Sequence, residues 1–233
     1  MAILYLVPNV LAEGDWQHVM PAQVYSILTE TRYFIVENIR TARRFMKQVN
    51  REIDIDECTF FEINKRTQMQ DLPRFLKPLV DGNDVAVISE AGCPGVADPG
   101  ADVVRMAHQR SFKVVPIVGP SSILLALMAS GLNGQNFAFK GYLPVKPNER
   151  SKEIAALEKR IRSEKQTQIF IETPYRNNNL ISDLLKTCSP STLLCIAANI
   201  TSEKEYIATK TIQDWKGNTP DLHKQPVIFL LGN

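Results

Sequence analysis

Two loops rich in glycine and proline constrain the fold most, because each follows an apolar run typical of a buried strand. The first loop spans residues 89–100 and the second spans residues 118–122. Open α/β sheets bind ligands where their parallel strands end. Plain connections between a strand and a helix usually have about 2–6 residues, so the length of the first loop favours a binding role over a simple connection.

The composition of these loops indicates how a ligand would be held. Gly92 and Gly95 permit backbone geometries closed to other residues, and Pro94 and Pro99 stiffen the loop and lower the cost of ordering it. The serines of the second loop fit either a plain helix N-cap or an anion site at a helix N-terminus. We expect a compact polar ligand, held by main-chain groups and small side chains.

Apolar runs alternate with helical patterns through the first half of the chain. The expected strands are residues 3–7, 33–37, 58–63, 85–89 and 113–118, and the expected helices are 20–28, 38 or 41–49, 68–80 and 101–110. This alternation predicts an α/β domain with a parallel sheet covered on both faces, over residues 1–118.

The second half, residues 119–233, has a more mixed pattern. Its expected strands are 137–142, 167–172, 192–198, 206–212 and 226–231, and its expected helices are 122–130, 151–165 and 179–186. Residues 206–212 alternate between apolar and polar side chains, as an exposed antiparallel strand does. We therefore predict a second α/β domain with a mixed sheet.

Net charge, the cysteines and histidines, and the length of the apolar runs disfavour several classes of protein. The chain has 233 residues and a net charge of +2, so any basic surface must be local. Its four cysteines form no C-x-x-C pair and its three histidines are isolated, which predicts reduced thiols in a cytoplasmic protein and no metal. No apolar run reaches the length of about 18 residues that a membrane span needs.

One predicted helix carries a basic face. Arg40, Arg43, Arg44 and Lys47 follow i, i+3, i+4, i+7 spacing and share one side. Such a face is either simply solvated or contacts the phosphates of a nucleic acid, and both readings stay open. Four further basic residues would extend the patch in the second domain: Lys140, Lys146, Arg150 and Lys152.

Four segments in a fixed order carry a family resemblance: residues 89–100, 118–122, 129–132 and 137–146. With Glu172-Thr173-Pro174-Tyr175-Arg176, near an E-x-P-H-R element, they resemble the tetrapyrrole methylase superfamily of S-adenosylmethionine-dependent methyltransferases. The similarity is greatest to its ribosomal small-subunit RNA cytidine 2′-O-methyltransferase group. The group's R-E-L-T-K element is replaced here by Ala198-Asn199-Ile200-Thr201-Ser202.

The resemblance implies that each chain has two α/β domains, with S-adenosylmethionine in the cleft between them. It also implies a homodimer. The residues it assigns to the cofactor are Pro8, Asn9, Gly92, Cys93, Pro94, Gly95, Val96, Ser121, Ser122, Ala198, Asn199 and Pro226. The basic residues Arg40, Arg43, Arg44 and Lys47 would bind RNA.

A hydroxyl acceptor needs a general base, and the candidates are Glu172, then Glu90, then Glu37. Three functions remain open at this point. The chain is an RNA ribose methyltransferase, a methyltransferase of a small tetrapyrrole-like molecule, or a non-catalytic module that binds S-adenosylmethionine.

Overall fold

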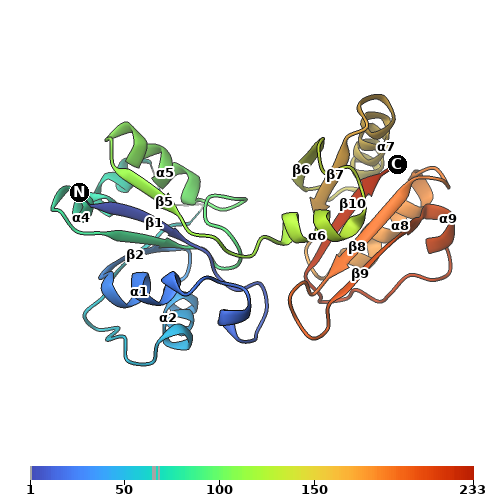
Figure 1. The fold of residues 1–233 in the computed structure, drawn as a ribbon. Coiled ribbons are helices and arrows are strands. Elements are labelled where there is room, and N and C mark those ends of the chain that lie inside the picture. Colours follow the sequence, from blue (N-terminus) through green and yellow to red (C-terminus); the bar gives the residue numbers. More distant parts are fainter. Residues whose placement is uncertain (1, 65–66, 68) are drawn as a thin grey trace. The chain divides into compact units, whose positions relative to one another are not determined.

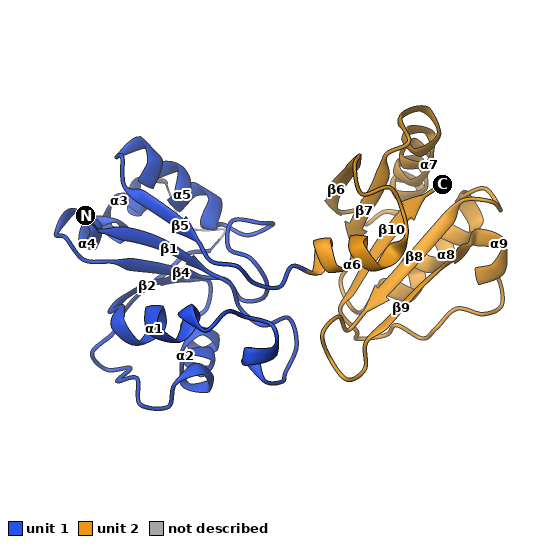
Figure 2. Cartoon of the chain, in the orientation of Figure 1, with its two compact units in different colours: residues 1–121 blue, residues 122–233 orange. Residues whose placement is uncertain are grey.

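The computed structural model describes residues 2–64, 67 and 69–233 of the chain. They form two compact units, residues 1–121 and 122–233, each with its own sheet and core (Figure 2). The division lies at residue 121, where the sequence indicated residue 118.

The sheet of the first unit is entirely parallel, in the order β3-β2-β4-β1-β5. Figure 1 labels β1, β2 and β5, and Figure 2 also labels β4. Its strands are β1 (Ile3–Val7), β2 (Tyr33–Val36), β3 (Thr59–Glu62), β4 (Val85–Ile88) and β5 (Lys113–Pro116). Every residue of β4 is buried, because this apolar run lies at the centre of a sheet covered on both faces. The predicted parallel α/β sheet is confirmed.

Helices cover both faces of this sheet. One face packs on α1 (Gln23–Glu30) and α2 (Ile39–Val49), which follow the short η1 (Trp16–His18). The other face packs on α3 (Leu72–Phe75), α4 (Lys77–Val80) and α5 (Gly100–Gln109), with η2 (Met69–Asp71) just before α3. Because β1, β4 and β5 run parallel, the loops that follow them all emerge at the carboxyl edge of the sheet.

The second unit has a mixed sheet in the order β6-β7-β10-β8-β9. Only β6 (Phe137–Tyr142) and β7 (Thr167–Ile171) run parallel to each other; β8 (Leu193–Ala198), β9 (Tyr206–Thr211) and β10 (Val227–Gly232) pair antiparallel. One face packs on α7 (Pro147–Glu164), α8 (Asn177–Thr187) and α9 (Ile212–Trp215). The remaining helix, α6 (Ser122–Ser130), contacts β8, β9 and β10. The predicted mixed sheet is confirmed.

The two largest departures from the predicted helix bounds both involve proline, whereas the other predicted helices shift by at most three residues at either end. The single helix expected over residues 68–80 is wrong: Gln68 lies outside the described residues, and the rest divides into η2, α3 and α4, with Pro73 and Pro78 in the first turns of α3 and α4. Proline lacks the N–H that would continue a preceding helix. Helix α7 begins at Pro147 rather than residue 151, since proline is favoured in a first turn.

Candidate functional site

The loops after β1 and β4 are joined to each other through Asn9. The backbones of Asn9 and Gly92 exchange two hydrogen bonds of 3.0 Å. The buried Asn9 side chain donates from Nδ2 to the carbonyls of Ser89 and Glu90, both at 3.1 Å, and its Oδ1 accepts from the Val10 N–H. The Asn9 amide therefore fixes the shape of both loops.

The β4 loop is held internally by two further side chains. Ser89 Oγ donates to the Gly92 carbonyl, and Asp98 Oδ1 accepts from the N–H groups of Gly95 and Gly100 at 2.8 and 2.7 Å. Burial raises the pKa of Asp98, although these two N–H donors oppose the shift. Sequence reasoning missed both anchoring roles; the Asp98-Pro99-Gly100 turn was the available signal.

The β5 loop closes against the other two. A Cβ added to Gly119 would lie 2.4 Å from Pro8 Cγ, so only glycine fits this approach of the β5 loop to the β1 loop. Cys93 Sγ lies 3.5 Å from the Pro120 carbonyl oxygen, and burial, followed by the nearby Asp98 charge, raises the pKa of this thiol. We call residues 8–14, 89–100 and 117–121 the loop cluster.

The structure thus brings together the residues that the sequence assigned to the cofactor in the first unit. Within the loop cluster Pro8, Asn9, Gly92 and Pro94 are buried, Cys93 and Gly95 are half-buried, and Val96 is exposed. Gly92 and Gly95 have φ values of +72° and +80°, in the left-handed region that favours glycine, as predicted. Ser121 ends the first unit and Ser122 begins α6.

Carboxylates converge beside the loop cluster. The Glu90 N–H donates to Glu37 Oε1 at 3.2 Å. Burial raises the pKa of Glu37, and the charges of Asp98 and Glu90 raise it further against that hydrogen bond. A cavity of about 440 Å³ is lined by residues that include all three carboxylates. No three His, Cys, Asp or Glu side chains are grouped to hold a metal ion in the part of the chain that the structure describes.

A second cavity, of about 550 Å³, lies between the β1 loop and helix α2. Arg44, Thr41 and Gln48 line it from α2, and Glu90 lines both cavities. Gln48 Nε2 donates to the Gly14 carbonyl at 2.6 Å, which ties the β1 loop to α2. A volume of this size lies within the range of about 300–1,000 Å³ typical of small-molecule sites.

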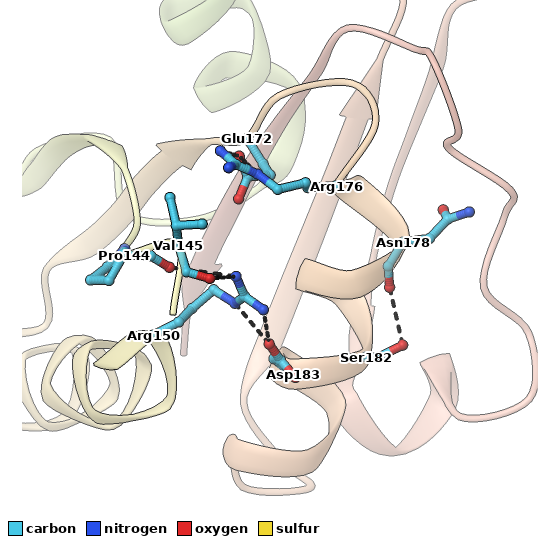
Figure 3. A network of polar contacts seen from close by, with 8 residues as sticks. All are labelled: Pro144, Val145, Arg150, Glu172, Arg176, Asn178, Ser182 and Asp183. Atoms are coloured by element: carbon cyan, nitrogen blue, oxygen red, sulfur yellow. Dashed lines mark hydrogen bonds and ion pairs between the residues drawn. The ribbon is translucent and has the colours of Figure 1, made fainter. Parts of the chain in front are cut away.

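The four basic residues of α2 are exposed, as predicted, but they differ in their contacts. The Arg43 guanidinium lies 5.0 Å from the centre of the Phe60 ring. Lys47 Nζ donates to the Arg51 carbonyl at 2.9 Å. The expected extension of this patch through Arg150 is wrong: Arg150 is buried and pairs with Asp183, and its Nη1 donates to the Val145 carbonyl (Figure 3).

In the second unit, the residues predicted near the cofactor lie where β7, β8 and β10 meet. Ala198 ends β8 opposite Val227, and the Asn199 N–H donates to the Pro226 carbonyl at 3.0 Å. Asn199 Nδ2 also donates to Gln225 Oε1 at 2.7 Å. Ala198, Asn199 and Pro226 therefore form one corner of the sheet.

Glu172 follows β7 at the same end of the sheet. Its buried carboxylate accepts through Oε1 from Arg176 Nη2 at 2.6 Å (Figure 3). The same oxygen accepts from the Thr173 N–H at 2.6 Å. Its Oε2 is buried and has no hydrogen-bond partner among the described residues. Sequence reasoning missed Arg176 as the partner of Glu172, although the i, i+4 spacing was a usable signal.

Both the sequence and the fold of this chain match those of known proteins. The sequence profile of the tetrapyrrole (corrin/porphyrin) methylases matches residues 20–216. A crystal structure of the methyltransferase CobJ shares the fold, with a TM-score of 0.62 at 18% identity, over 100% of this chain and 93% of that one. In the described residues, no helix is both long and apolar enough to cross a membrane.

Two relatives that are longer than this chain strengthen the match. The chain is 30% identical to the ribosomal RNA small subunit methyltransferase I of Vibrio cholerae, over 98% of this chain and 76% of that protein. It is 31% identical to the protein of the same name from Pasteurella multocida, over 74% of this chain and 61% of that protein. The chain therefore belongs to the tetrapyrrole (corrin/porphyrin) methylase family of methyltransferases.

Proposed function

We propose that this protein transfers a methyl group from S-adenosylmethionine to a ribose 2′-hydroxyl of small-subunit ribosomal RNA. The observation that carries the proposal is its similarity, over nearly the whole chain, to relatives named as ribosomal RNA small subunit methyltransferases. The proposed substrate implies a cytoplasmic site of action.

Residues of both units fit the cofactor. In the first unit, Gly92 and Gly95 give the β4 loop positive φ values, and Gly92 packs so closely that a Cβ on it would meet the Leu11 side chain at 3.3 Å. In the second unit, Glu172 Oε2 is a buried acceptor that fits a donor such as an amino group. Unpartnered buried acceptors are costly, so a ligand donor there is favourable. When bound, the cofactor supplies an electrophilic methyl group on its sulfonium.

Glu90 is the better-placed candidate for the general base. Its side chain is exposed, and it lines both the cavity beside Glu37 and the cavity beside Arg44. The Glu172 carboxylate, in contrast, is held by Arg176 and by the main chain. We therefore assign proton removal from the acceptor hydroxyl to Glu90 and cofactor binding to Glu172. Transfer itself depends mainly on alignment of donor and acceptor.

The basic face of α2 suits the RNA backbone. Arg40, Arg44 and Lys47 are exposed, and Arg44 also lines the larger cavity. Phosphate contacts of this kind supply affinity that falls with salt.

We further propose a homodimer, for which the exposed Leu124 and Met128 of α6 offer an apolar surface; Met128 is 78% exposed.

Two measurements, made one after the other, test the proposal. Calorimetry with S-adenosylhomocysteine should detect binding to the full chain. Small-subunit ribosomal RNA from cells lacking the protein should then gain a ribose methyl group on incubation with protein and S-adenosylmethionine, detected by mass spectrometry. Binding without RNA methylation would favour a small-molecule acceptor, and no binding would refute the cofactor assignment.

A further inference from the structure

The second unit has an exposed tyrosine, Tyr175, in a turn that backbone hydrogen bonds hold in place. Tyr175 is 69% exposed, although it lies in the turn between β7 and α8. The Arg176 N–H donates to the Thr173 carbonyl at 2.9 Å and closes that turn, and the Lys224 N–H donates to the Pro174 carbonyl at 3.0 Å. The backbone around Tyr175 is therefore fixed on both sides while its ring faces solvent.

The neighbours of this ring come from the segment just before β10. The His223 ring stands edge-on to the Tyr175 ring, with centroids 5.8 Å apart and an interplanar angle of 77°. Lys224 Nζ lies over the Tyr175 ring, 5.8 Å from its centre. Among the residues that the structure describes, Lys224 forms no ion pair, so its charge remains available to an anion.

Asparagines at the start of α8 hold that segment in place. Asn177 Nδ2 donates to the carbonyls of Leu222 and Gln225, at 3.2 and 2.8 Å. Asn178 Oδ1 accepts from the Leu222 N–H. Lys224 is held at a φ of +60°, a left-handed conformation that non-glycine residues adopt uncommonly. The backbone that carries Lys224 beside Tyr175 is thus fixed by the surrounding structure.

The carboxylate in the segment just before β10 already accepts hydrogen bonds from its neighbours. The Asp221 carboxylate accepts from Asn178 Nδ2 at 2.7 Å and from the His223 N–H at 3.0 Å, and these hydrogen bonds lower its pKa. Glu172 is likewise paired with Arg176. The surface offered to a ligand is therefore the exposed Tyr175 ring, with the Lys224 cation over one of its faces.

We propose that Tyr175, His223 and Lys224 form a stacking platform for one unpaired base of a single-stranded RNA segment, with Lys224 on an adjacent phosphate. An exposed aromatic ring beside a cation is the combination that binds single strands, because every base has a π-face and every linkage has a charge. The inference rests on the proposed function and adds a contact in the second unit to those of α2.

The test measures binding of a labelled single-stranded RNA oligonucleotide by fluorescence anisotropy. Loss of one stacked base costs about 1–3 kcal/mol, which predicts binding about 5- to 150-fold weaker for Tyr175→Ala. Tyr175→Phe should bind as the original protein does, because the π-face remains. Lys224→Ala should reduce the slope of log affinity against log salt by about 0.7, the value for one phosphate on a single strand.

Tyr142→Ala is the matched control, since Tyr142 is 60% exposed at the end of β6 and has no ring contact with the described residues. The platform is refuted if Tyr175→Ala and Tyr142→Ala bind the oligonucleotide equally, or if the original protein does not bind it. Methylation of small-subunit ribosomal RNA by the original protein is assayed alongside. Methylation without any effect of Tyr175→Ala refutes the platform alone, whereas no methylation and no RNA binding refutes the proposed function as well.

Discussion

At the scale of single residues, the site depends on close approaches that tolerate no extra atom. Gly119→Ala places a methyl group 2.4 Å from Pro8 Cγ, and overpacking of this kind costs about 1–3 kcal/mol. We expect a lower free energy of unfolding in urea and weaker binding of S-adenosylhomocysteine. Gly134→Ala is the control, because a Cβ there meets nothing within 4 Å. Equal stability of the two variants would show that the loop cluster adjusts freely.

Asp98 gives the loop cluster a dependence on pH. Burial raises its pKa above the usual 3.8, so the folded chain holds this proton more tightly than the unfolded chain does. The free energy of unfolding should therefore decrease as pH rises from about 4 through the raised pKa. Asp98→Asn keeps an acceptor for Gly95 and Gly100 but has no proton to lose. Urea midpoints of the variant should show a smaller decrease between about pH 4 and pH 7 than those of the original protein.

At the scale of elements, helix α2 separates two roles on one basic face. The Arg43 guanidinium lies on the Phe60 ring, an exposed contact worth about 0.5–1 kcal/mol, whereas Arg44 lines the larger cavity. We expect Arg43→Ala to lower stability more than Arg44→Ala does, and Arg44→Ala to weaken RNA binding more than Arg43→Ala does. Urea unfolding and anisotropy on the two variants measure this. The reverse order in RNA binding would contradict the assignment of Arg44 to contact with the RNA backbone.

Elements with a clear local signal were predictable, and contacts between distant residues were not. The continuous apolar run of β4 indicated a buried parallel strand, as the structure has it, whereas ligand binding by its Gly/Pro loop stays a prediction. Nothing local distinguishes Arg150, which pairs with Asp183 from another helix, from the exposed Lys146. Asn9 likewise acts on carbonyl groups about 80 residues away. Such pairings depend on how the chain folds back, which periodicity does not record.

At the scale of the whole molecule, the chain holds two units with separate cores and one tryptophan in each. Trp16 is buried in the first unit and Trp215 in the second, and the sequence has no other tryptophan. Two units with their own cores need not unfold in a single two-state transition. Trp215→Phe leaves fluorescence that reports the first unit alone, and Trp16→Phe leaves fluorescence that reports the second.

We expect the urea midpoint read by Trp16 to differ from the midpoint that Trp215 reports. The Trp215 indole donates to the Leu194 carbonyl at 2.8 Å, so its replacement costs stability in the second unit. Circular dichroism, which reports both units, therefore has to be recorded on each variant and on the original protein. Two steps by circular dichroism, each matching one tryptophan, would establish independent unfolding. A single coincident transition in all three proteins would mean that the units unfold together, because coupling between them then outweighs the separate cores.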